Sequence, residues 1–389
     1  MKNIKIVFAL LVAVFLNTSL PAQNFKDGKY KKEKEIDTFV LDKTYEVQNI
    51  KPYTGGEKPA KNIILLIGDG MGSSHVFAGI TANNGNTYFQ QFHNNGYSRT
   101  SAANKYTTDS AAGGTAIATG QKTNYGAIGV DVDNKPVESI LEIADENGKA
   151  TGMVATSSIT HATPASFIAH QPQRKMYDEI AYDFLSTDID VFIGGGKNNF
   201  NKRKDGLNLL DSLKSRGYSI IDNESDILKY KGNKLAGFIA DGHPRGISKR
   251  GDILVKSTEK AIEILSENKN GFFLMVEGSQ IDWAAHDNNT KDLINEVADF
   301  DKAVGEALKF AAKDGNTLVI VTADHETGGF AVKGGDDKTG KVKGVFSSTG
   351  HTATMVPVFA YGPGAEQFRG IYQNNELFDK MLKAYGFSK

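Results

Sequence analysis

The sequence predicts an α/β protein, a three-layer sandwich in which helices cover both faces of a mostly parallel central sheet. Short apolar runs alternate along the chain with longer stretches whose apolar residues recur at helical spacing, as in strands joined by crossover helices. We find no internal repeat and no clear linker, and 389 residues with 40% hydrophobic content can bury a large core. We therefore expect a single domain over residues 61–389.

The individual strands and helices can be placed along the chain. Apolar runs between turn-forming residues predict buried strands, and the amphipathic stretches between them predict helices. Residues 333–344, rich in Gly, Lys and Asp, predict an exposed loop. The predicted strands are 63–67, 152–155, 191–194, 272–276, 318–322 and 356–361, and the predicted helices are 136–147, 206–216, 253–268 and 291–313.

Residues 1–22 have the features of a secretory signal peptide. Lys2 and Lys5 precede an apolar run over residues 6–16, and the small Ala22 offers a cleavage point. A permanent membrane anchor is the alternative, but the run is short for a bilayer and a polar stretch follows it. Residues 23–60, polar and broken by Gly and Pro, predict an N-terminal arm. We expect export to the periplasm or the extracellular medium.

The composition excludes several kinds of partner and site. The formal net charge is only -1, so there is no global basic field, and we expect neither a specific nucleic acid nor a membrane as partner. The chain contains no cysteine, which excludes disulfide bonds and cysteine-ligated metals. Any anion site must therefore be local.

Carboxylates follow three predicted strands at the point where each strand ends. Asp69 follows strand 63–67, Glu277 follows 272–276, and Asp324 follows 318–322. Ligands of such sheets bind in the crevice beyond the carboxyl ends of the strands. Asp69 lies between two glycines, a pattern also typical of a plain turn, although its carboxylate is a suitable hard ligand for a metal. Three strand ends of this kind are hard to explain structurally and favour a site.

Histidines accompany these carboxylates. Asp282 and His286 are four residues apart in a stretch that can begin a helix, so they share one face and suit zinc, although a solvated helix start is the alternative. His325 directly follows Asp324, and the two can reach one metal. His351 lies in a predicted loop, where a histidine is either simply exposed or a ligand.

Ser110 and Arg174 are the candidates for handling a phosphoryl group. Ser110 precedes a small-residue stretch that can form a helix, whose N-terminus offers free amides and partial positive charge to an anion. The alternative is that Ser110 only caps this helix. The guanidinium fork of Arg174 can grip two phosphoryl oxygens, or Arg174 is an ordinary surface residue.

Taken together, these motifs resemble the alkaline phosphatase family in order and spacing. The resemblance implies a phosphomonoesterase that releases inorganic phosphate from monoesters of broad structure. It extends from about Lys61 to the C-terminus. The segments that carry it are 62–72, 106–129, 161–177, 272–286, 321–329 and 349–364.

The resemblance also implies a role for individual residues. Ser110 is expected to be the nucleophile that forms a phosphoserine intermediate, and Arg174 is expected to bind phosphate. The family holds two zinc ions and one magnesium ion beside these residues. By resemblance, Asp282, His286 and His351 hold one zinc, Asp69, Asp324 and His325 hold the second, and Asp69, Thr163 and Glu277 hold magnesium.

Two positions and one segment depart from well-known members of the family. Enterobacterial members carry Asp where His161 stands and Lys where Trp283 stands, so this pair bears on the metal preference of the third site. Trp283 either packs beside the metals or changes how tightly phosphate is held. The segment between His325 and His351 is shorter than in members whose insertion helps to form a dimer. This short segment is compatible with either a monomer or a homodimer. It also predicts that the crevice is accessible to substrates of varied structure.

Other metal-dependent hydrolases and a binding protein are the rival interpretations. Sulfatases need a Cys/Ser-x-Pro-x-Arg segment that we do not find, phosphodiesterase relatives usually present threonine, and the related phosphoglycerate mutase is cytoplasmic. An exported protein that binds metal or phosphate without turnover is argued against by the presence of both Ser110 and Arg174. The sequence therefore predicts an exported alkaline phosphatase.

Overall fold

The central sheet is built from strands whose two faces are both buried. Every residue of β2 (Asn62–Gly68) is buried, with Ile64 and Leu66 in one hydrophobic cluster and Ile63 and Leu65 in another. Successive side chains of a strand point to opposite faces, so a continuous apolar run requires cover on both sides. The sheet is therefore the middle of three layers, as predicted.

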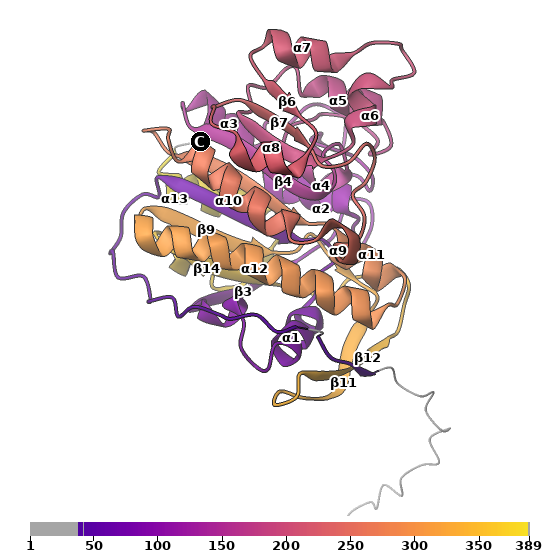
Figure 1. Ribbon diagram of the computed structural model, residues 1–389, viewed down its shortest axis with the longest axis vertical. Helices are drawn as coiled ribbons and strands as arrows, with labels where there is room; N and C mark the ends of the chain where they lie inside the picture. Colours follow the sequence, from indigo (N-terminus) through magenta and orange to yellow (C-terminus); the bar gives the residue numbers. More distant parts are fainter. Residues whose placement is uncertain (1–37, 42, 388–389) are drawn as a thin grey trace, which may run out of the picture. The chain divides into compact units, whose positions relative to one another are not determined.

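The computed structural model describes residues 38–41 and 43–387. These residues belong to one compact unit (Figure 1). The predicted signal peptide, residues 1–22, and residues 23–37 of the predicted arm lie outside the described residues.

The large sheet has ten described strands in the order β15-β3-β14-β9-β2-β8-β4-β5-β7-β6. β14 pairs antiparallel with β9 and with β3, whereas the other neighbouring pairs are parallel. The predicted mostly parallel sheet is confirmed. Besides β2, its strands are β3 (Asn94–Arg99), β4 (Ala150–Ser158), β5 (Val191–Gly195), β6 (Ser219–Ile221), β7 (Leu235–Phe238), β8 (Phe272–Gly278), β9 (Thr317–Thr322), β14 (Val356–Tyr361) and β15 (Gly370–Gln373).

All six predicted strands are present, and the missed ones lie toward the two ends of the sheet order. β6 and β7 form one end, and β15 and β3 the other. β3 reads Asn-Asn-Gly-Tyr-Ser-Arg and contains no apolar run. β3, β6 and β15 are only partly buried, so their sequences need not be continuously apolar, whereas β7 is completely buried but only four residues long.

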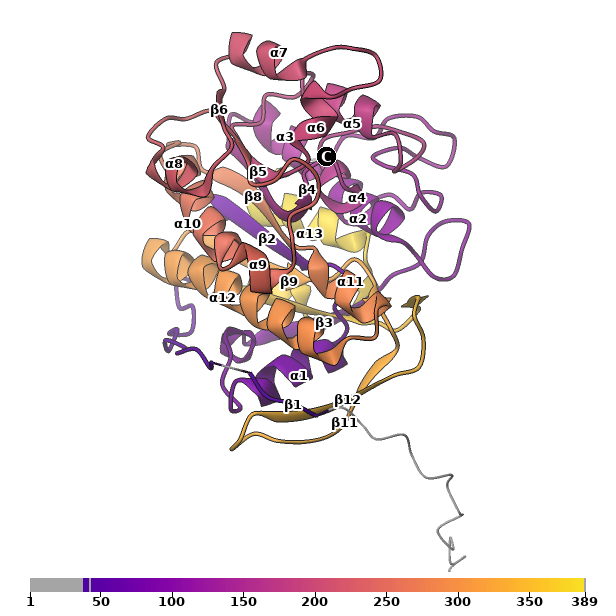
Figure 2. The same ribbon diagram turned by 45° about the vertical axis from the view of Figure 1, so that its right-hand side comes forward.

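Helices cover both faces of the sheet, and Figures 1 and 2 show α10 and α12 side by side on one of them. Residues of α1, α8, α10, α11 and α12 join one hydrophobic cluster, and residues of the other helices except α9 join the second. The first group is α1 (Ser73–Ala82), α8 (Glu224–Lys229), α10 (Ile253–Leu265), α11 (Gln280–His286) and α12 (Thr290–Asp314), with α9 (Ile247–Arg250) contacting α12. The second is α2 (Ser110–Thr119), α3 (Ile140–Glu146), α4 (Ala162–Ala165), α5 (Tyr177–Asp183), α6 (Lys197–Asn201), α7 (Leu209–Ser215) and α13 (Glu376–Tyr385).

The four predicted helices correspond to α3, α7, α10 and α12, with α3 shorter than expected. It begins after Ser139, whose hydroxyl accepts from the Glu142 amide while the Glu142 carboxylate accepts from the Ser139 amide. This reciprocal cap sets the start of α3 after the predicted position 136.

The prediction of a loop over residues 333–344 is wrong. β11 (Phe330–Asp336) and β12 (Lys341–Phe346) form an antiparallel hairpin, and β1 (Thr38–Phe39) pairs with β12. Glycines hide the alternation of this hairpin in the sequence because they have no side chain. A Cβ at Gly344 would lie 2.4 Å from the Phe330 ring, so this glycine makes room for packing.

Candidate active site

Three neighbouring parallel strands deliver carboxylates to one edge of the sheet. β9, β2 and β8 are adjacent, and Asp324, Asp69 and Glu277 lie just beyond or near their carboxyl ends. All three side chains are completely buried. The fold therefore brings these three strand-end carboxylates to the same edge of the sheet.

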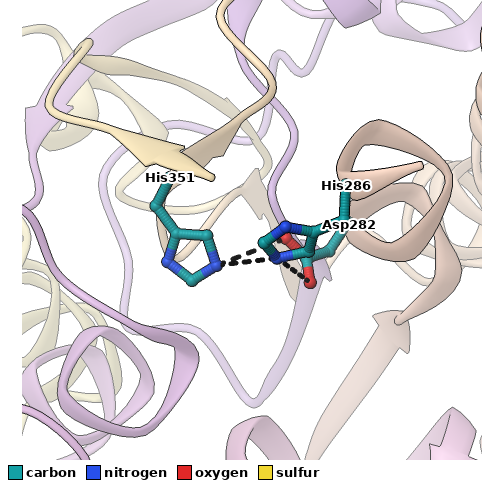
Figure 3. Close-up of side chains that lie close together, drawn as sticks. All are labelled: Asp282, His286 and His351. Carbon is teal, nitrogen blue, oxygen red and sulfur yellow. Dashed lines mark hydrogen bonds and ion pairs between the residues drawn. The ribbon is translucent and has the colours of Figure 1, made fainter. Parts of the chain in front are cut away.

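Asp282, His286 and His351 form the first donor set (Figure 3). α11 places Asp282 and His286 one turn apart, and β13 (His351–Thr352) pairs with β10 (Glu326–Thr327) to bring in His351. The His286 Nε2 atom lies 3.1 Å from His351 Nε2 and 3.4 Å from Asp282 Oδ2. These atoms converge from elements that are distant in the chain.

Hydrogen bonds to backbone carbonyls orient both histidines of this set. His286 Nδ1 lies 2.5 Å from the Thr349 carbonyl oxygen, and His351 Nδ1 lies 2.8 Å from the Thr108 carbonyl oxygen. Because a carbonyl oxygen only accepts, each Nδ1 carries the proton and donates. Without metal, the hydrogen bond with Asp282 raises the pKa of His286 to about 9, so a proton can lie on His286 Nε2 between the groups. When that proton is lost, both Nε2 atoms present lone pairs beside a carboxylate, which is the donor arrangement of a metal site.

Asp69, Asp324 and His325 form the second donor set, and Ser110 lies against it. His325 Nε2 is 3.4 Å from Asp69 Oδ1 and 3.5 Å from Asp324 Oδ2, and all three side chains are fully buried. Ser110 Oγ lies 3.3 Å from His325 Nε2 and 3.5 Å from Asp69 Oδ1. A cation in this set would therefore lie beside the serine oxygen.

A third set combines Asp69 with Glu277 and His161, and Thr163 lies nearby on α4. Glu277 Oε2 accepts from the hydroxyls of Ser157 and Ser279, at 3.1 and 2.5 Å. Four buried polar atoms here have no hydrogen-bond partner: Asp69 Oδ2, Glu277 Oε1, Thr163 Oγ1 and His161 Nδ1. Buried polar atoms normally have partners, and hard oxygen donors suit magnesium, so the three oxygen atoms of Asp69, Glu277 and Thr163 fit a cation. His161 Nδ1 is not such a donor while His161 Nε2 accepts from Arg174, because the ring proton is then on Nδ1.

The electrostatics of the three donor sets also favour bound cations. Burial raises the pKa of Asp69 well above its usual range, and the charges of Asp324 and Asp282 raise it further. Burial likewise raises the pKa of Glu277 to about 7. Burial also acts to raise the pKa of Asp282, but the hydrogen bond from His286 and the nearby histidines outweigh it and lower the pKa. This many carboxylates are stable together only with positive charge between them.

Helix α2 frees the Ser110 hydroxyl for the site. Its N-cap is Asp109, whose Oδ1 accepts from the Ala112 amide at 3.2 Å. The alternative that Ser110 merely caps the helix is therefore wrong. Ser110 is the first residue of α2, and its side chain is 1% exposed and directed at the second donor set.

Arg174 is held beside this helix by two side chains. Its Nη1 donates to Asp109 Oδ2 at 2.9 Å, and its Nη2 donates to His161 Nε2 at 3.2 Å. Because Nε2 of His161 accepts, the neutral ring carries its proton on Nδ1. Burial and the Arg174 charge lower the pKa of His161 to about 3, so the ring stays neutral. Arg174 is a positioned guanidinium with 24% of its side chain exposed.

Trp283 packs at the side of the third set. Its ring meets those of His161 and His243 edge to face, with centroids 5.9 and 4.9 Å apart. Asp282, a donor of the first set, is the preceding residue on α11. The indole therefore lies beside a metal donor and beside His161, the partner of Arg174.

Sequence reasoning missed two residues that organise the site, Asp109 and Thr327. Asp109 could have been found, because Asp before a helix is a common N-cap. Thr327 Oγ1 lies 2.5 Å from Asp282 Oδ1 and 3.1 Å from His325 Nδ1, between the first two donor sets. Apart from its place two residues after His325, nothing in the sequence marks it.

Comparison with known proteins covers most of the chain. Residues 60–345 match the family model for alkaline phosphatase. Alkaline phosphatase 4 of Bacillus subtilis is 39% identical over 83% of this chain and 88% of its own length, and the Escherichia coli alkaline phosphatase is 33% identical over 85% and 87%.

Solved structures agree with these matches. Alkaline phosphatase from the Antarctic bacterium TAB5 is 46% identical, with a TM-score of 0.81 over 86% of this chain and 100% of that one. A histidine-to-aspartate variant of the TAB5 enzyme, 47% identical with a TM-score of 0.80 over the same shares, has Mg bound in its M3 site. The family-model match includes β2, β8, β9 and α2, the elements that meet at the site. This chain therefore belongs to the alkaline phosphatase family and is a metal-dependent hydrolase of phosphate monoesters.

Proposed function

We propose that the chain hydrolyses phosphate monoesters of broad structure through a phosphoserine intermediate on Ser110, at a site for two zinc ions and one magnesium ion. The observation that carries the proposal is the place of Ser110 Oγ, 3.3 Å from His325 Nε2 and 3.5 Å from Asp69 Oδ1 at the start of α2. A buried hydroxyl among metal donors and free helix amides is suited to attack a phosphoryl group.

The three donor sets are assigned to ions by their chemistry. A carboxylate with two imidazoles suits zinc, and so does a set with one imidazole and two carboxylates. The oxygen-rich third set suits magnesium. Zinc would be held by Asp282, His286 and His351 and by Asp69, Asp324 and His325. Magnesium would be held by Asp69 and Glu277 together with Thr163, whose Oγ1 is buried without a partner. When bound, these ions would lower the pKa of the serine hydroxyl and neutralise charge on the phosphoryl and leaving oxygens.

The residues of the chain divide the reaction into two displacements. In the first, Ser110 Oγ gives up its proton and bonds to phosphorus. The bond between phosphorus and the ester oxygen breaks, and that oxygen gains a proton and leaves as the alcohol. In the second, a water molecule gives up one proton as its oxygen bonds to phosphorus, the bond between phosphorus and Ser110 Oγ breaks, and Ser110 Oγ regains a proton. Inorganic phosphate is then released. Arg174, held by Asp109, grips phosphoryl oxygens in both steps.

Recognition of the phosphate rather than of its alcohol accounts for the breadth of substrates. Arg174 and the amides of α2 would bind oxygens of the phosphoryl group and not the alcohol part of the ester. The segment between His325 and His351 contains only the short β10 and the hairpin β11–β12. Steep discrimination among alkyl and aryl monoesters would contradict this part of the proposal.

The test measures phosphate release from p-nitrophenyl phosphate at alkaline pH with zinc and magnesium. Wild type should be active, Ser110→Ala should lose nearly all activity, and zinc chelation should do the same. Ser257→Ala is the matched control, because Ser257 is equally buried but lies on α10 away from the site. Phosphorylation of Ser110, trapped by acid quenching and located by peptide mass spectrometry, reports the intermediate directly.

Three outcomes would overturn all or part of the proposal. Cleavage of bis-p-nitrophenyl phosphate without cleavage of the monoester would indicate a phosphodiesterase. Retention of phosphate without release from either ester would indicate a binding protein. Activity that survives in Ser110→Ala would leave the enzyme a phosphatase but remove the phosphoserine step.

A further inference from the structure

The hydroxyl of Thr327 contacts both of the first two donor sets. Its Oγ1 lies 2.5 Å from Asp282 Oδ1, in the first set, and 3.1 Å from His325 Nδ1, in the second. The threonine side chain is completely buried. A Cβ added at Gly70 would lie 2.8 Å from Thr327 Oγ1 and 2.9 Å from Asp282 Oδ1, so the surrounding chain is packed closely against this contact.

Counting protons determines the direction of both hydrogen bonds. A threonine hydroxyl has one proton to donate and lone pairs to accept, whereas an ionised carboxylate only accepts. Thr327 therefore donates to Asp282, and its oxygen accepts from His325 Nδ1–H. With the proton on Nδ1, a neutral His325 ring presents its Nε2 lone pair to Asp69, Asp324 and Ser110.

His325 differs in this respect from the other two histidines of the metal sets. His286 and His351 donate from Nδ1 to backbone carbonyls, at 2.5 and 2.8 Å. A carbonyl is present whatever residue occupies the position. His325 depends instead on a side chain, so a substitution at Thr327 can remove its acceptor.

The backbone of Thr327 is also fixed between the two sets. Its amide donates to the Gly70 carbonyl at 3.0 Å, in the turn that follows Asp69. Thr327 also pairs with His351 where strands β10 and β13 lie side by side. The hydroxyl is thus tied through its own backbone to ligand-bearing segments of both sets.

We propose that Thr327 is a positioning residue that couples the two zinc sites, by orienting Asp282 and holding His325 in its Nδ1–H tautomer. The inference rests on the proposed two-zinc function. Outer partners of metal ligands raise metal affinity by fixing the orientation and tautomer of the ligand. One hydroxyl that serves a ligand in each set should affect both sites together.

The test compares zinc binding to metal-free Thr327→Val, Thr327→Ser and wild type by competition with a chromophoric zinc chelator. Valine keeps the shape but has no hydroxyl, so we expect zinc to be bound about 10- to 100-fold more weakly, at both sites. Serine keeps the hydroxyl and should restore binding close to wild type. Thr258→Val is the matched control: Thr258 is fully buried, donates to the Leu254 carbonyl at 2.8 Å on α10, and should not affect zinc.

A second measurement uses only the wild-type chain and so does not depend on how the variants fold. Nitrogen-15 NMR of the metal-free protein at alkaline pH should show His325 protonated on Nδ1. A proton on Nε2 would overturn the inference. So would a Thr327→Val protein with wild-type zinc affinity, or a loss confined to one site.

The failure of this inference can be told from failure of the proposed function. A wild-type chain that binds no zinc would overturn both. A wild-type chain that binds two zinc ions and forms phosphoserine, while Thr327→Val binds zinc as tightly, would overturn the coupling role alone.

Discussion

His286 and His351 point their Nε2 atoms at each other across 3.1 Å, although they lie 65 residues apart in the chain (Figure 3). Each ring donates from Nδ1 to a backbone carbonyl, so each neutral ring directs a lone pair into the gap. Asp282 adds carboxylate oxygens within 3.4 and 3.7 Å of the two Nε2 atoms. Electron-rich atoms at these distances repel one another unless a proton on His286 Nε2 or a metal cation lies among them.

Removing the metals should therefore destabilise the folded chain. We expect a lower unfolding midpoint after chelation and recovery when zinc is added, since the complete donor sets exist only in the native state. Free zinc at 100 times its dissociation constant should stabilise the protein by about 2.7 kcal/mol. Differential scanning calorimetry checks this, with His351→Gln expected to reduce the response and the exposed His93→Gln to leave it unchanged. Equal midpoints with and without metal would count against the donor-set assignment.

Asp109→Asn should weaken phosphate binding through Arg174. Asparagine keeps the shape of the side chain but loses the charge that holds the Arg174 guanidinium at 2.9 Å. A hydrogen bond to a charged group contributes on the order of 1.5–3 kcal/mol, so the inhibition constant of inorganic phosphate should rise roughly tenfold or more. Competitive inhibition assays measure it. Asp205→Asn, which disrupts the Asp205–Arg203 pair elsewhere, should leave the constant as in wild type; an equal effect would show that the change is not local.

Gly113→Ala should push α2 away from the second donor set. A Cβ at this position would lie 2.8 Å from the Asp324 carbonyl oxygen, and backbone cannot yield as a flexible side chain can. Overpacking of this kind costs about 1–3 kcal/mol of unfolding free energy. We also expect weaker zinc binding and a lower kcat/KM, because Ser110 and Asp324 move apart. Urea unfolding and zinc titration measure both effects. Gly334→Ala is the control, because a Cβ at Gly334 would meet only Lys343 Cδ at 3.6 Å. It should change neither the unfolding free energy nor zinc binding.

The His170–Glu142 ion pair should stabilise the fold at mildly acidic pH and not at alkaline pH. His170 donates to the Gly129 carbonyl at 2.6 Å and to Glu142 Oε1 at 2.9 Å, so both ring nitrogens carry protons. Burial acts to lower the pKa of His170, but the Glu142 hydrogen bond and charge outweigh it and raise the pKa. Burial acts to raise the pKa of Glu142, but the hydrogen bond and charge of His170 outweigh it and lower the pKa.

The sign of each shift defines the pH window of this ion pair. The His170 contribution is complete below its unfolded pKa of about 6.5 and is lost as pH rises through the raised folded pKa, whereas the Glu142 contribution is complete above about 4.3 and is lost in acid. In metal-free protein, His170→Gln should therefore lower the unfolding free energy by up to about 1 kcal/mol more at about pH 5.5 than at about pH 9.5. Urea unfolding at the two pH values measures the difference. If His170→Gln lowered the unfolding free energy equally at the two pH values, the His170–Glu142 ion pair would not be the cause. An equally large pH dependence in the control His93→Gln would also contradict this assignment.

The amino-acid pattern was sufficient to predict the features that depend on neighbours along the chain. A strand buried on both faces must be apolar throughout, so the run at 63–67 was enough to predict β2 and, with its counterparts, the sandwich. The four-residue spacing of Asp282 and His286 likewise puts both on one face of α11. These properties follow from helix and strand periodicity and do not depend on what packs against the element.

Which distant atoms share a partner depends on how the chain packs in three dimensions. Asp109, and not Ser110, caps α2, which leaves the serine hydroxyl for the second donor set. The hairpin at 330–346 is held by pairing that its glycines conceal. Thr327 reaches both Asp282 and His325 because three chain segments pack around its hydroxyl. Hydrogen bonds and metal sites are satisfied by atoms brought within a few ångströms by packing, and no local periodicity encodes those distances.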